Sequence, residues 1–135
     1  MALDAAARAV GAPVEILEAI NVTLPSGLVV PDIVVADAGA TVDDGVSIDA
    51  EAVQLVVELV SPGNKTMDRK FKPMLYAEAA IPHYWRLEFD PAPRLVITEL
   101  ENGRYVEQAT ALSGEVTRLD APFPFAIDPA GLARQ

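Results

Sequence analysis

Two short segments that are apolar on both of their alternating faces constrain the fold of this chain more than any other feature. They are LVVPDIVVA at residues 28–36 and VQLVVELV at residues 53–60. Successive side chains of a strand point to opposite faces of a sheet, so these segments predict strands that are buried on both sides. Each segment contains one acid, Asp32 or Glu58. Burying either side chain as an anion would cost several kcal/mol unless a cation or good hydrogen-bond donors lie beside it.

The remaining sequence predicts further strands. Asn102 and Gly103 form a strong hairpin signal, and residues 37–52, rich in Asp, Gly and Ala, are typical of a loop. Alternating apolar residues and turn signals predict strands at residues 14–24, 83–89, 94–101, 104–112 and 116–119.

A central helix is predicted at residues 65–79, where the spacing of apolar residues is helical. Its face through Phe71 and Leu75 is expected to pack on the sheet. Pro73 is expected to kink or interrupt this helix, because proline has no N–H to donate to the preceding turn. Shorter helices are expected at residues 2–10 and from Asp128.

Length and composition agree with one α+β (mixed α/β) domain over residues 1–135 with a C-terminal β-hairpin extension. Of the 135 residues, 51% are hydrophobic, which is enough for a core. No apolar run approaches the roughly 18 residues that span a membrane, so a cytoplasmic protein that does not bind membranes is expected. The chain has no cysteine, which leaves carboxylates and the single histidine, His83, as candidate metal ligands. Without a second histidine, His83 is expected to have a structural or solvent-exposed role rather than to bind a metal.

Charge is distributed unevenly along the chain. The 20 Asp+Glu and 10 Lys+Arg give a formal net charge of -10, which argues against an extended nucleic-acid-binding surface. All three lysines, Lys65, Lys70 and Lys72, nevertheless lie with Arg69 in one short basic segment. This segment is either an ordinary solvated helix face or a group of cations placed beside the two acids.

Each acid also has a simpler interpretation when it is considered alone. Pro31 and Asp32 could form a bend with a solvated carboxylate, and Glu58 could point to water from a strand edge. Taken together, two acids on adjacent core strands before a lysine-bearing helix favour an oxygen-rich site. Such a site suits Mg²⁺ or Mn²⁺, which would neutralise both carboxylates.

Several motifs occur in an order that resembles a known family. They are LVVPDIVVA, then VVELVSP, then Asp68, Lys72 and Tyr76 at intervals of four residues, then IPHYW at residues 81–85. Over roughly residues 14–130 the chain resembles the Uma-type putative restriction endonucleases of the PD-(D/E)XK nuclease superfamily. The resemblance implies a restriction-endonuclease-like core sheet flanked by helices. It also implies Mg²⁺- or Mn²⁺-dependent hydrolysis of DNA phosphodiester bonds.

The resemblance also implies roles for individual residues. Asp32, Glu58 and the backbone carbonyl of Leu59 would bind the metal. Val60 stands where the superfamily has its catalytic lysine, which implies that Lys72 on the following helix takes that role. Ser61, Asp68 and Tyr76 would support these residues from the surrounding shell, although packing is the simpler role for Tyr76.

Two alternatives remain open at this point. The chain is expected to lack an N-terminal segment that members of the family usually contain, so it could be a catalytically impaired, nuclease-like interaction module. Such a module would act as a homodimer or a partner-binding domain, and a homodimer is expected for an active nuclease as well. A small-ligand β-domain without a metal is the third interpretation.

Overall fold

The structure is a computed structural model that describes residues 11, 13–18, 20–25, 27–38, 47–60, 71–89 and 92–130. The predicted helix at residues 2–10 lies outside these ranges. The strands are β1 (Val14–Glu18), β2 (Asn21–Leu24), β3 (Gly27–Val29), β4 (Ile33–Asp37), β5 (Ser47–Asp49), β6 (Val53–Val60), β7 (His83–Glu88), β8 (Arg94–Glu101), β9 (Arg104–Leu112), β10 (Thr117–Leu119) and β11 (Phe125–Ile127). The helices are the 3-10 helix η1 (Ala50–Ala52) and the α-helix α2 (Lys72–Glu78).

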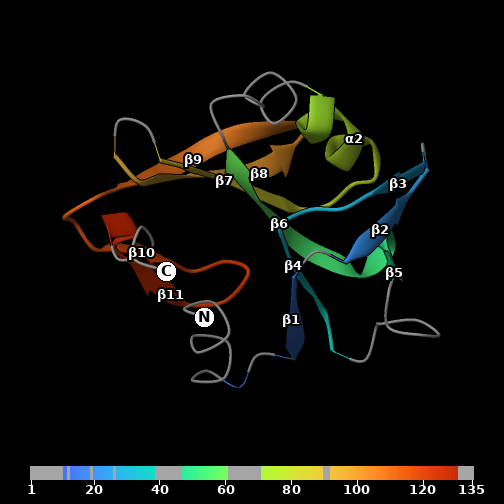
Figure 1. Ribbon diagram of the computed structural model, residues 1–135, viewed down its shortest axis with the longest axis horizontal. Helices are drawn as coiled ribbons and strands as arrows, with labels where there is room; N and C mark the ends of the chain where they lie inside the picture. The colour runs from blue at the N-terminus through green and yellow to red at the C-terminus, as the bar shows by residue number, and fades with distance from the viewer. Residues whose placement is uncertain are drawn as a thin grey trace.

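A six-stranded sheet in the order β1-β4-β6-β7-β8-β9 forms the centre of the fold (Figure 1). Only the β6–β7 pair of this sheet is parallel, and α2 lies in the connection between these two strands. Alternate residues divide the core into two layers. Val34, Val56 and Tyr84 pack on the side of α2, whereas Val35 and Trp85 pack with the β10–β11 hairpin on the other side. The described residues form mostly sheet and one α-helix, and this architecture confirms the predicted α+β class.

The chain crosses between the large sheet and a smaller one, and this corrects two strand predictions. The small sheet has the order β3-β2-β5. Residues 14–24 are therefore two strands in different sheets, β1 and β2, and residues 28–36 are likewise divided into β3 and β4. Pro31 lies at the second crossing, where it cannot donate to a continuing ladder. Leu28 and Val30 are exposed there, so this segment is not buried on both sides.

The central helix differs from its prediction in start and orientation. Helix α2 begins at Lys72, which places Pro73 in the first turn, where its missing N–H costs no helical hydrogen bond. The expected kink or interruption at Pro73 concerns the join to residues 65–70, so it stays a prediction. Phe71 is exposed, and Tyr76 instead is fully buried against the sheet. The rest of the predicted helix, residues 65–70, lies outside the described ranges.

The second half of the sheet agrees closely with its prediction. β8 and β9 pair as a hairpin, with Asn102 and Gly103 at φ values of 52° and 84°. Positive φ at both central residues is what a type I′ hairpin turn requires. β10 was predicted, whereas its partner β11 and the short β5 were not. No helix in the described ranges is long and apolar enough to cross a membrane.

Candidate active site

Asp32, directly before β4, and Glu58 of β6 lie on the side of the sheet that α2 covers. β4 and β6 are antiparallel, and Ile33 pairs with Val57. Asp32 directly precedes Ile33 and Glu58 directly follows Val57, so the next pair along the ladder brings the two acids opposite each other. A hydrogen bond of 2.7 Å from the Leu59 N–H to Asp32 Oδ2 fixes this arrangement. Asp32 occupies a bend, as the simpler interpretation expected, but it is half-buried and its carboxylate accepts the Leu59 N–H instead of being left to solvent.

Glu58 is buried inside the protein, with 1% of its surface exposed. The interpretation that it points to water from a strand edge is therefore wrong. Lys72 Nζ lies 3.2 Å from Glu58 Oε2, and the Tyr76 hydroxyl donates a hydrogen bond to Glu58 Oε1. Burial raises the pKa of Glu58 from 4.5 to about 7, against the opposing effects of Tyr76 and Lys72. Asp32 adds to the rise because two carboxylates repel each other as anions.

Tyr76 combines packing with a polar contact. Its ring lies 5.6 Å from that of Tyr84, between centroids, in the core layer under α2. Burial and the nearby Glu58 raise the pKa of Tyr76, so its hydroxyl stays protonated and remains a donor. Tyr76 therefore orients the Glu58 carboxylate while it also packs.

The donor set at this place fits a hard divalent cation. Asp32 and Glu58 provide carboxylate oxygens, and the Leu59 carbonyl is the oxygen donor expected beside them. Mg²⁺ is commonly bound through one or two carboxylates and retains several waters. Among the described residues no group of three or more His, Cys, Asp or Glu side chains gathers around one point.

A second charged group, which the sequence analysis missed, lies one strand away. Arg86 of β7 is the register neighbour of Glu58. Its Nε donates to Glu88 Oε2 over 3.2 Å, and the Arg94 guanidinium donates to Glu88 Oε1, with Nε at 2.9 Å. Glu88 is buried, with 3% of its surface exposed. The available signal was the placement of Arg86 and Glu88 two residues apart in an otherwise apolar strand.

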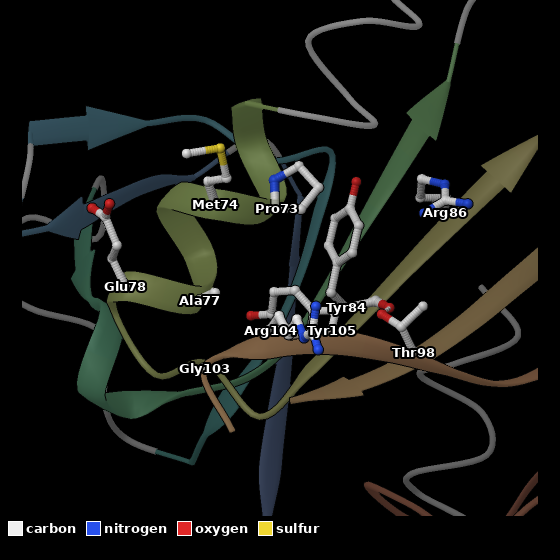
Figure 2. A pocket seen from close by; sticks show the side chains of 10 residues that line it. All are labelled: Pro73, Met74, Ala77, Glu78, Tyr84, Arg86, Thr98, Gly103, Arg104 and Tyr105. Atoms are coloured by element: carbon white, nitrogen blue, oxygen red, sulfur yellow. Dashed lines mark hydrogen bonds between the residues drawn. The ribbon is translucent and has the colours of Figure 1, made fainter. Parts of the chain in front are cut away.

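A cavity of about 550 Å³ lies between α2 and the strands β7, β8 and β9 (Figure 2). Asp32 and Glu58 do not line it, so the cavity adjoins the acidic pair without enclosing it. Tyr84 and Arg86 of β7 belong to its wall and connect it with the neighbours of Glu58. Its lining residues are Pro73, Met74, Ala77, Glu78, Tyr84, Arg86, Thr98, Gly103, Arg104 and Tyr105.

The remaining predicted residues fall into two groups. Ser61 and Asp68, like Lys65, Arg69 and Lys70, lie outside the described ranges. His83 is half-buried at the start of β7, and burial lowers its pKa. A neutral, half-buried imidazole agrees with the structural role expected for it. Asp32, Glu58, Leu59, Lys72 and Tyr76 do come together.

Comparisons with known proteins agree with this architecture. A family model described as "Uma2: Putative restriction endonuclease" matches residues 2–132. A solved structure from Anabaena variabilis ATCC 29413, described as a "putative nuclease belonging to DUF820", superposes with a TM-score of 0.62 at 14% sequence identity. The alignment covers 90% of this chain and 66% of that one, and at this identity the likeness shows the fold alone. No curated protein matches the chain.

Proposed function

Because the chain belongs to the Uma2 family of putative restriction endonucleases, we propose that it is a metal-dependent endonuclease acting on DNA. The observation that supports this most directly is the grouping of Asp32, Glu58 and Lys72. Asp32 and Glu58 extend the same antiparallel ladder, and Lys72 lies 3.2 Å from Glu58. Two carboxylates and an amine at one point of a sheet are the parts that metal-assisted phosphodiester hydrolysis requires.

Asp32, Glu58 and the Leu59 carbonyl would hold Mg²⁺ or Mn²⁺. The chemistry that such an ion supplies when bound is a lowered pKa of water and stabilisation of the charge on the transition state. The Leu59 N–H keeps Asp32 in place, and the Tyr76 hydroxyl keeps Glu58 in place. Both bonds hold the carboxylates before any ligand arrives, which reduces the cost of organising the site.

Lys72 would act on the substrate side of the site. Its amine is the counter-ion of Glu58 in the described structure. With a divalent cation bound at Glu58, the ammonium group would orient the attacking water or neutralise the scissile phosphate. The supporting role of Ser61 and Asp68 stays a prediction. The homodimer and the cytoplasmic location also stay predictions. The grouped acids and lysine favour the enzyme over the interaction module.

Cleavage assays with matched variants test this function. The protein is incubated with single-stranded, duplex and branched DNA in Mg²⁺, in Mn²⁺ or in EDTA. Cleavage is expected only with metal, and Asp32→Ala, Glu58→Ala and Lys72→Ala are each expected to abolish it. Glu115→Ala and Arg118→Ala remove exposed charges of the same signs elsewhere and serve as controls. The absence of metal-dependent cleavage on all three substrates would reject the proposal.

A further inference from the structure

The cavity beside α2 has the composition of a binding site for a nucleoside. Its volume of about 550 Å³ falls within the range of small-ligand pockets, which is ~300–1,000 Å³. The half-buried Tyr105 ring and the side chains of Met74 and Ala77 form apolar walls, and the fully buried Tyr84 supports Tyr105 from behind, with 5.4 Å between the two ring centroids. The Tyr105 hydroxyl donates to the Ile81 carbonyl over 2.6 Å, so this ring is held in place. Aromatic walls of this kind stack with bases of any sequence.

Arg86 provides a positioned cation at the wall of this cavity (Figure 2). The Glu88 carboxylate accepts hydrogen bonds from Arg86 Nε and from the Arg94 guanidinium group. These two cations and one anion have a summed charge of +1. The bond to Glu88 uses Nε, and the other donors of the Arg86 guanidinium are its two Nη groups. A planar guanidinium held in this way suits the recognition of a phosphate.

The position of Arg86 relates the cavity to the proposed cleavage site. Arg86 and Glu58 are register neighbours on adjacent strands, which lie ~4.8 Å apart. Successive phosphates of one DNA strand are separated by a similar length, ~3.4 Å along the helix axis and more when the strand is extended. A strand whose scissile phosphate lies at a metal held by Asp32 and Glu58 would therefore have a neighbouring phosphate near Arg86.

The described cations are concentrated on this side of the molecule. The described ranges contain Lys72, Arg86, Arg94, Arg104 and Arg118. Lys72 contacts Glu58, Arg86 and Arg104 line the cavity, and Arg94 contacts Glu88. The same region also contains four acids, Asp32, Glu58, Glu78 and Glu88, so it carries no excess of positive charge, and a contact with a phosphate depends on the placement of single cations such as Arg86.

We propose that the cavity binds one unpaired nucleotide of single-stranded DNA, with its phosphate on Arg86 and its base between α2 and the half-buried ring of Tyr105. This inference rests on the proposed function and specifies the substrate class of the same site. A base can enter the cavity only after it has left its stack, and an unpaired strand meets this condition at a lower cost than a duplex. The protein therefore prefers single-stranded DNA to a duplex of the same length.

Fluorescence anisotropy with a labelled 12-nucleotide single strand tests the proposal in EDTA, where no metal-dependent cleavage occurs. Arg86→Gln is expected to weaken binding about tenfold, since it removes a charge-assisted hydrogen bond. It should also lower the slope of log K against log salt concentration by about 0.7, the contribution of one phosphate contact in a single strand. Arg118→Gln, the same change at an exposed residue of β10, should leave both values unaltered.

A second variant tests the cavity without changing charge. Ala77→Leu fills space between α2 and the sheet, so binding is expected to weaken while the salt slope stays the same. The preference of the wild type for the single strand over the duplex should disappear in this variant. Ala77→Leu does not depend on Arg86, so it decides the question even if Arg86→Gln fails to fold.

Three results would overturn the inference. The first is that the wild type does not bind at ~1 mM protein, a concentration above the range of non-specific dissociation constants. The second is that Arg86→Gln binds as tightly as Arg118→Gln. The third is that Ala77→Leu binds as tightly as the wild type. The proposed hydrolysis fails separately, because its test is cleavage with metal. A protein that binds through Arg86 and never cleaves would reject the hydrolysis and support the cavity.

Discussion

Glu58→Gln is expected to change the pH dependence of stability of the metal-free protein. Glu58 is buried and its pKa is about 7 in the folded protein, against 4.5 for an unperturbed side chain. A tenfold change in proton affinity corresponds to about 1.4 kcal/mol, so the folded protein loses about 3 kcal/mol when Glu58 ionises. Glutamine has nearly the same shape and does not ionise.

The sign follows from the direction of the pKa change. Because folding raises the pKa of Glu58, the protonated carboxyl adds its full share of stability below pH 4.5. This share decreases as the pH rises from 4.5 to about 7 and is absent above that. The stability of the wild type minus that of Glu58→Gln should therefore fall by about 3 kcal/mol between pH 4.5 and pH 8.

Urea denaturation in EDTA, followed by the fluorescence of the single tryptophan, Trp85, measures this difference. The other titrating groups are shared by both proteins, so they cancel in the subtraction. Glu115→Gln changes an exposed acid in the same way and should give a difference from the wild type that does not vary with pH. A difference for Glu58→Gln that stays flat, or that rises with pH, would contradict the reasoning.

Three further outcomes test the site and the fold. Mn²⁺ should raise the melting temperature more at pH 8 than at pH 5.5, because protons compete with Mn²⁺ for the Glu58 carboxylate. Asp32→Asn should abolish this rise, and an equal rise in that variant would argue against the site. Tyr76→Phe should reduce the free energy of unfolding by about 1–3 kcal/mol because Glu58 Oε1 loses its hydroxyl donor while Lys72 still contacts Oε2, and a smaller loss in urea denaturation would contradict that role. Gly103→Ala should cost about 1 kcal/mol through its positive φ alone, since a Cβ there meets nothing within 4 Å; a loss near 3 kcal/mol would show that contacts matter as well.

The accuracy of the fold prediction depended on whether a pattern was local. The hairpin turn at Asn102 and Gly103 and the strand β6 (Val53–Val60) were predicted with their observed bounds, because turn chemistry and alternation define both within a few residues. Residues 14–24 and 28–36 were predicted as single strands and are not. Both segments have a continuous apolar pattern, and a crossing between two sheets leaves that pattern unbroken, so periodicity alone does not reveal it.

The site prediction found acids that interrupt apolar strands but could not determine their surroundings. Glu58 stood out because it interrupts β6, and its partner Tyr76 was expected mainly to pack. A tyrosine such as Tyr76 occupies the same position in the helical pattern whether its ring only packs in the core or its hydroxyl also binds a buried carboxylate. Asp32 was recognised by the same interruption, although its bend follows from Pro31. Contacts between different elements depend on tertiary packing, which a single helical or strand period does not encode.

Arg86 and Glu88 show the opposite case, in which a charged pair was overlooked because it satisfies itself. Two residues of opposite charge at i and i+2 lie on one face of a strand, and they can pair without any other element. Such a pair gives no reason to expect a function. Its meaning changes once β7 is parallel to β6, because that register places Arg86 beside Glu58 and at the wall of the cavity. A buried ion pair in a strand next to a proposed metal site is therefore better treated as part of the substrate surface until binding measurements exclude it.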